Sequence, residues 1–149
     1  MSADLRDLYQ EIILEHSRKP KNAGTLDDAD GEAKGNNPLC GDRISVYVKL
    51  EGDRIADAKF DARGCAISVA SASMMTDLLK GKTVDEAKAE SERFTGLLTG
   101  KDAPDLAEDD ELAALTGVRE FPTRIKCATL PWHTFAAALD GNDTDVTTE

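Results

Sequence analysis

The chain contains three cysteines, and each stands in a sequence context that suits a reactive or metal-bound thiolate. Cys40 lies in the Gly- and Asn-rich segment 35–42, Cys65 follows a glycine, and Cys127 follows two basic residues and an isoleucine. Together with Asp42 they offer three sulfurs and one carboxylate, which is enough to complete a tetrahedral zinc site. The same thiols could also carry sulfur.

Cys65 has the clearest physical basis for a thiolate. The sequence predicts that it stands where a strand passes into a helix over residues 66–80. The amino end of a helix carries free N–H groups and a partial positive charge, and both favour a thiolate. The alternative is a buried cysteine that packs as a small apolar residue. Gly64 indicates an unusual backbone conformation or a close approach, which favours a functional role.

Cys40 and Asp42 flank a glycine in a segment typical of turns. In a turn both side chains can reach one point and bind the same cation. For Asp42 alone the better explanation would be turn chemistry, in which an aspartate accepts hydrogen bonds from nearby backbone. Next to a cysteine, turn chemistry and cation binding are equally open.

Cys127 has the cationic neighbours Arg124 and Lys126, which would stabilise a thiolate. Pro131 cannot donate a backbone hydrogen bond to the carbonyl of Cys127, so we expect a helix that is kinked there or begins after Cys127. The alternative role for Cys127 is core packing. The cysteine spacing is unlike the paired CxxC of zinc ribbons, and by itself it leaves a shared metal site and three unrelated thiols equally open.

Composition limits the class of protein. The chain has 149 residues, is 40% hydrophobic and 32% charged, and carries a net charge of −11. These values predict one globular domain over residues 1–140 and an acidic, disordered tail over 141–149. The acidity argues against nucleic-acid binding, and no apolar run approaches the ~20 residues that span a bilayer. We expect a monomer.

The odd number of cysteines argues against a complete disulfide framework and favours a reducing compartment. The amino terminus has neither the basic nor the apolar region of a secretory signal. The sequence therefore predicts a cytoplasmic location.

Periodicity predicts an α+β fold in which a small antiparallel sheet has helices over one face. Apolar spacing indicates a helix over 3–17, and alternation indicates a hairpin of strands at 44–50 and 54–63, with Ala56, Ala58, Phe60 and Ala62 on one face. Segment 22–42 is predicted to be loop or short edge strand. Thr83 and Glu86 form a capping box that opens a helix to about residue 98. An acidic loop over 99–110 and a short helical turn at 111–115 precede a last helical stretch that ends at about residue 139.

Three segments, 37–42, 64–68 and 124–127, resemble the cysteine motifs of the U-type iron–sulfur assembly proteins, the IscU/NifU N-terminal family. The resemblance runs from about residue 5 to 139. Within the family the chain is most similar to the SufU branch. The scaffold branch has a histidine where this chain has Lys126, and the stretch between Leu98 and Phe121 is longer here, as in SufU-type proteins.

The resemblance implies the three-stranded sheet of that family and a zinc ion held by Cys40, Asp42, Cys65 and Cys127. It implies a SufS-like cysteine desulfurase as partner, whose histidine displaces Cys40 from zinc so that Cys40 accepts persulfide sulfur. Arg124 would contact this partner, and the sulfur would pass to downstream iron–sulfur assembly machinery. Two alternatives are an assembly scaffold that binds a transient iron–sulfur cluster and a small fold with purely structural zinc.

Overall fold

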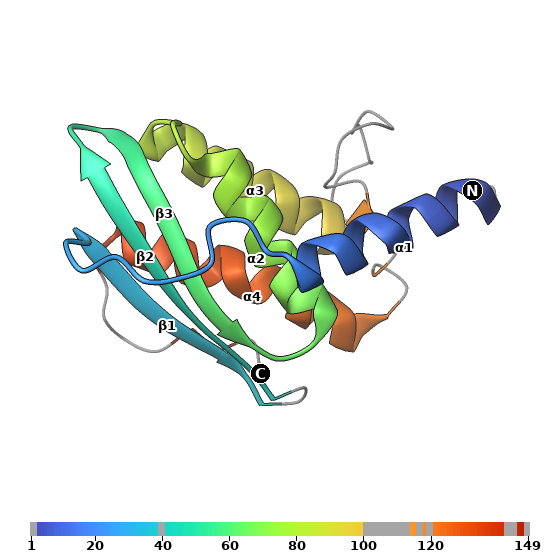
Figure 1. Cartoon of the computed structure of the whole chain (residues 1–149). Helices are drawn as coiled ribbons and strands as arrows, with labels where there is room; N and C mark the ends of the chain where they lie inside the picture. Colours follow the sequence, from blue (N-terminus) through green and yellow to red (C-terminus); the bar gives the residue numbers. More distant parts are fainter. Residues whose placement is uncertain are drawn as a thin grey trace.

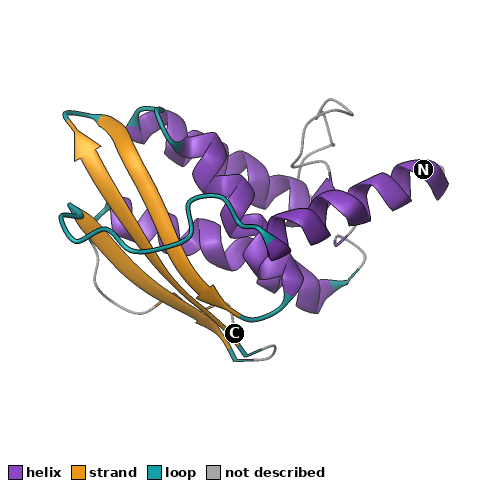
Figure 2. Cartoon of the chain, in the orientation of Figure 1, coloured by secondary structure: helices purple, strands orange, loops and turns teal. Residues whose placement is uncertain are grey.

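In the computed structural model, the described residues are 3–38, 41–99, 114–115, 118, 121–141 and 146–147, with side chains described from Gln10 onward. A sheet forms one side of the molecule and helices form the other (Figures 1 and 2). The elements follow in the order α1 (Ala3–Arg18), β1 (Gly31–Asn37), β2 (Asp42–Glu51), β3 (Arg54–Arg63), α2 (Ala66–Leu79), α3 (Val84–Thr99), α4 (Pro122–Leu139) and β4 (Val146–Thr147).

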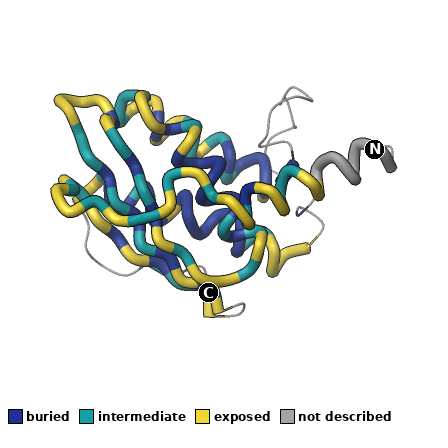
Figure 3. The backbone as a smooth tube through the Cα atoms, viewed as in Figure 1, coloured by how far each residue is buried: buried dark blue, intermediate teal, exposed yellow. Residues whose placement is uncertain are grey.

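The central sheet is the predicted one. Strands β1, β2 and β3 pair antiparallel in sequence order, and helices α2 and α4 cover one face. Burial alternates along β2, where Ile44, Val46 and Val48 face the helices and are at most 3% exposed. Segment 22–42, expected to be loop or short edge strand, contains β1. Figure 3 shows the buried residues between the sheet and the helices.

The predicted inward face of β3 is wrong at Ala56. A β-bulge lies between Lys49 and Leu50, where the register passes from Asp57 to Ile55 and leaves Ala56 without a partner. The extra residue turns Ile55 inward, where it is 0% exposed, and Ala56 outward. Strict alternation misses such a bulge because one inserted residue reverses the facing of every side chain beyond it.

Two residues within the segment 141–149 form the short strand β4. Val146 and Thr147 pair parallel with Gly35 and Asn36 of β1, so the sheet has four strands in the order β3-β2-β1-β4. β1 is otherwise an edge strand with unpaired backbone groups, and such an edge can recruit even a short polar segment.

The helices match the predicted positions. α1, α2 and α3 begin and end within about two residues of expectation, and the capping box is present: Thr83 N–H donates to Glu86 Oε1, and Glu86 N–H donates to Thr83 Oγ1. The last helix does not begin after Cys127. It begins at Pro122, a residue favoured in a first turn, and continues through Pro131.

The core lies between the helices and the inner face of the sheet. Phe94 of α3 stacks on Trp132 of α4 with ring centroids 4.4 Å apart, and both rings are fully buried. The small residues of α2 let it pack with burial on most sides. Ala114 and Leu115, in the predicted helical turn, form a short 3₁₀ segment and are buried. The predicted acidic loop lies outside the described residues, apart from Thr99 at the end of α3.

Within the described portion of the chain, no helix combines the length and the apolar character needed to cross a bilayer.

Candidate metal centre

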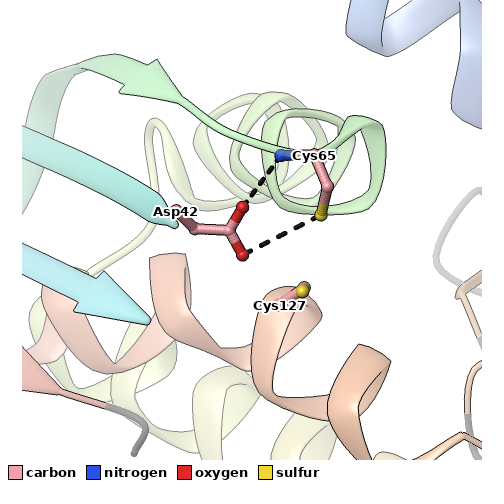
Figure 4. A group of neighbouring side chains, drawn as sticks. All are labelled: Asp42, Cys65 and Cys127. Atoms are coloured by element: carbon pink, nitrogen blue, oxygen red, sulfur yellow. Dashed lines mark hydrogen bonds between the residues drawn. The ribbon is translucent and has the colours of Figure 1, made fainter. Parts of the chain in front are cut away.

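Asp42, Cys65 and Cys127 come together at one end of the sheet. One potential ligand atom from each lies within 4.8 Å of the other two. They come from three elements: Asp42 opens β2, Cys65 is the N-cap of α2, and Cys127 lies in α4, with the side chains pointing toward one another (Figure 4). The structure therefore brings together three of the four residues that the sequence analysis selected.

The fourth, Cys40, lies outside the described residues. In the sequence it stands between Asn37 and Asp42, which are register partners at the closed end of the β1–β2 hairpin.

Asp42 joins the beginning of β2 to the beginning of α2. Its Oδ1 accepts a hydrogen bond from the backbone N–H of Cys65 at 2.8 Å, and its Oδ2 lies 3.8 Å from Cys65 Sγ. The carboxylate therefore sits at the amino end of α2, where the helix dipole favours negative charge. This contact joins residues far apart in sequence, so the role of Asp42 extends beyond local turn chemistry.

Gly64 makes the close approach of Asp42 and Cys65 possible. Its φ of +151° lies in a region that L residues rarely adopt, and a Cβ at this position would overlap Asp42 Oδ1 and lie 2.9 Å from Asp42 Cα. Both the conformation and the contact require glycine. The expectation of an unusual backbone and a close approach at Gly64 is confirmed.

Asn37 is a residue of the centre that the sequence reasoning passed over. It is fully buried, and its Nδ2 lies 3.4 Å from Asp42 Oδ2 and 3.5 Å from Cys127 Sγ. An amide donor so placed orients a carboxylate and a sulfur at once, as the outer partners of metal ligands do. Its position in β1 could have identified it, because Asn37 lies two residues after Gly35 and four after Ala33 and therefore faces inward with them. This pattern can be recognised only once β1 is known to be a strand.

Cys127 is fully buried in α4. Its Sγ contacts the carbonyl oxygen of Thr123 at 3.5 Å, one turn earlier in the helix. Since Pro131 has no N–H, the carbonyl of Cys127 lacks its regular helical donor, as the sequence analysis expected.

The three side chains fit a borderline-soft cation such as Zn²⁺. Zinc lies about 2.3 Å from thiolate sulfur and about 2.0 to 2.2 Å from carboxylate oxygen, so the ligand atoms of a tetrahedral site are separated by roughly 3.5 to 4 Å. In the structure the potential ligand atoms of the three residues lie within 4.8 Å of one another, close to this range. Asp42 and Cys127 are fully buried, whereas Cys65 is partly exposed, so the cluster opens on the Cys65 side.

Neither Arg124 nor the histidines belong to this cluster. Arg124 is exposed near the beginning of α4, within one turn of Cys127. His16 is buried, and its Nδ1 lies 2.7 Å from Ser73 Oγ of α2.

The fold and the cluster together define a small α+β domain with a cysteine- and aspartate-lined centre at one end of its sheet. The sequence model of the NifU-like N terminal domain matches residues 8–139, and the chain belongs to that family. The resemblance stated from the sequence is thereby confirmed.

Two relatives and one solved structure show which members of this family the chain resembles. It is 47% identical over 131 residues to the zinc-dependent sulfurtransferase SufU of Bacillus subtilis, covering 88% of each chain. It is 42% identical over 135 residues to the iron-sulfur cluster assembly scaffold protein IscU of Streptococcus pyogenes, covering 91% of this chain and 84% of that one.

The solved structure is described as a candidate iron–sulfur cluster assembly scaffold protein for the SUF system of Fervidobacterium islandicum. It superposes with a TM-score of 0.82 at 34% identity and covers 90% of this chain and 98% of the other. This match confirms the predicted IscU/SufU-like fold.

Proposed function

We propose that this protein is a zinc-dependent sulfurtransferase that accepts persulfide sulfur from a cysteine desulfurase for iron–sulfur cluster assembly. The observation that carries the proposal is the convergence of Asp42, Cys65 and Cys127 within 4.8 Å in a chain 47% identical to a zinc-dependent sulfurtransferase. A single U-type domain over residues 1–140, working as a monomer in the cytoplasm, is part of the proposal.

The metal ligands would be Asp42, Cys65 and Cys127 together with Cys40. Cys40 stands two residues before Asp42, and covalent geometry limits their Cα separation to about 8 Å. A bound zinc ion supplies charge that keeps thiols deprotonated and protects them from oxidation. Asn37 and Thr123 would hold the carboxylate and the Cys127 sulfur in place from outside the ligand set.

Cys40 would be the acceptor of sulfur. Its thiolate attacks the outer sulfur of the desulfurase persulfide, a new S–S bond forms on Cys40, and the bond to the desulfurase cysteine breaks. That cysteine leaves as a thiolate, so charge and electrons balance without any external oxidant or reductant. Cys65 and Cys127 are anchored by α2 and α4, so Cys40 would be the thiol suited to leave the centre.

Arg124 would contact the desulfurase. It is exposed in the first turn of α4, the same helix that carries Cys127, so a partner that reaches the centre passes close to it. Sulfur on Cys40 would then go to the downstream iron–sulfur assembly machinery.

A second candidate function is an assembly scaffold that holds a transient iron–sulfur cluster. It is favoured by the 42% identity to the IscU scaffold protein of Streptococcus pyogenes, and it would use the same cysteines and Asp42. Lys126, which stands where the scaffold branch is expected to have a histidine, favours the transferase instead.

Metal analysis and desulfurase turnover separate these functions. Protein purified without added metal is expected to contain one zinc per chain and to stimulate the desulfurase, and Cys40→Ala should abolish the stimulation. A brown, oxygen-sensitive species that retains iron and sulfide on the chain would support the scaffold. Full stimulation and full zinc content in Cys40→Ala would overturn the assignment of Cys40.

Asp42→Ala tests the ligand set, with Asp53→Ala in the exposed β2–β3 turn as the matched control. We expect reduced zinc content in the first variant and normal content in the second. Normal zinc in both would restrict Asp42 to its contact with the backbone of α2.

A further inference from the structure

Two arginines face each other across the solvent side of the sheet, next to the metal centre. Arg43 of β2 is the register partner of Arg63 of β3, and both side chains are exposed. Arg43 directly follows Asp42, and Arg63 precedes Cys65 by two residues. The pair therefore lies on the outer face of the same strand ends whose inner face carries the centre.

The arginines line an open hollow of about 870 Å³, which we call the arginine hollow. Its other lining residues include Lys34 and Asn36 of β1 and Asp61 of β3. Lys34 adds a third cation. Its register partner is Ser45, so it lies two residues farther than Arg43 from the closed end of the β1–β2 hairpin. The hollow also reaches Pro38 and Gly41, which flank Cys40 in the sequence.

The two arginines have no ion-pair partner within the described part of the chain. None of the ion pairs found there involves Arg43 or Arg63, although five other pairs are formed. Like charges directly opposite in an antiparallel pair destabilise a sheet. Acidic side chains outnumber basic ones by 29 to 18 in the whole chain, and Asp42 and Asp61 also line the hollow, yet neither forms an ion pair with these arginines in the described residues.

We propose that the arginine hollow docks an acidic segment of the protein that delivers sulfur. The identity of that partner rests on the proposed function. Guanidinium groups bind carboxylates through paired hydrogen bonds, and two neighbouring arginines suit a segment with two or more acidic side chains. Docking at this rim would bring the partner to the loop of Cys40.

An acidic protein segment fits better than other anions. A nucleic acid carries phosphates beyond the reach of this local patch, where the acidic excess of the chain would repel them, whereas a short acidic segment can confine its charges to the hollow. A small anion would remain largely hydrated between exposed arginines on an open sheet face. A protein surface adds contacts around the pair and excludes water from it.

The test compares Arg43→Glu/Arg63→Glu with Lys59→Glu in binding to the cysteine desulfurase. Lys59 lies four residues before Arg63 on the same side of β3, and it is outside the hollow. Calorimetry at low and moderate salt should show affinity reduced about tenfold or more in the double variant, with a weaker salt dependence, and nearly unchanged in Lys59→Glu. Zinc content and circular dichroism verify that each variant is folded.

Equal affinities for the wild type and the double variant would overturn the inference while leaving the proposed function intact. A wild type that neither binds nor stimulates the desulfurase would overturn the proposed function, and with it the partner named here. Phosphate that binds the wild type but not the double variant, together with unchanged desulfurase affinity, would assign the hollow to a small anion and also overturn the inference.

Discussion

Ser71 of α2 and Trp132 of α4 are joined by a buried hydrogen bond, in which Trp132 Nε1 donates to Ser71 Oγ at 3.0 Å. Ser71 Oγ in turn donates to the carbonyl of Ala128 at 2.6 Å. Ala128 follows Cys127, and Cys65 lies at the beginning of the helix that carries Ser71. One hydroxyl therefore fixes the two helices that present the cysteines of the metal centre.

Replacing Ser71 by Ala should destabilise the protein by about 1 to 3 kcal/mol, because the indole N–H is left buried without an acceptor. Urea unfolding of the zinc-free protein measures this loss. Ser68→Ala is the matched control, since Ser68 lies on the same helix, is equally buried and has no hydrogen-bond partner in the structure. Ser68→Ala should be neutral or stabilising, and an equal loss in both variants would contradict the role given to Ser71.

Gly64→Ala should disrupt the metal centre. The new Cβ would overlap the Asp42 carboxylate. The alanine would also have to keep a backbone φ of +151°, and together these effects should cost about 2 kcal/mol or more. We expect lower zinc content as well as lower stability. Gly52→Ala, at a turn glycine with a φ of +66° and open space around it, should lose about 1 to 2 kcal/mol and keep its zinc. Full zinc retention in Gly64→Ala would show that the strand–helix junction can shift.

Asn37→Ala should weaken zinc binding about tenfold or more, because the amide holds both Asp42 and Cys127 in position. Competition with a chelator gives the affinity. Asn36→Ala offers a neighbouring control, since the side chain of Asn36 lies on the opposite face of β1. Equal zinc affinity in both variants would restrict Asn37 to packing.

The Thr83–Glu86 capping box predicts a pH dependence. Hydrogen bonds from the Thr83 backbone, followed by its side chain, hold the pKa of Glu86 below its usual value of 4.5. Since the folded-state pKa is lowered, this stabilisation is present above the usual pKa and is lost as the pH falls through the lowered value. Carboxyl NMR titration should show the shift. Glu86→Gln, which does not titrate, should flatten the acid limb of the stability curve, and an unshifted Glu86 would contradict the cap.

The order of the helices and the β2–β3 hairpin could be predicted from sequence because they depend on local signals. These signals involve residues only a few positions apart, as in the alternation of Ile44, Val46 and Val48 and in the capping box. The bulge at Ala56 carries no such signal, because it depends on how two strands match in length and twist. The β4 pairing likewise depends on an edge that exists only after the sheet has formed.

The candidate site was selected by residue type and family resemblance, and the structure shows what spacing could not. Asp42, Cys65 and Cys127 are far apart in sequence and meet because β2 and α2 begin beside the second turn of α4. Asn37 was overlooked because an asparagine beside a proline is typical of a turn. Its contacts with two site residues are long-range and become visible only in three dimensions.

The short strand β4 has a practical consequence for preparing this protein. It runs parallel to β1, and Thr147 is the register partner of Asn36, one residue before the buried Asn37. β4 therefore ends on the same side of the fold as the metal centre. A polyhistidine tag fused close behind Thr147 would bring imidazole groups toward that side, where they could compete with the cysteines as ligands and alter the measured zinc stoichiometry. A tag placed ahead of α1 avoids this artefact.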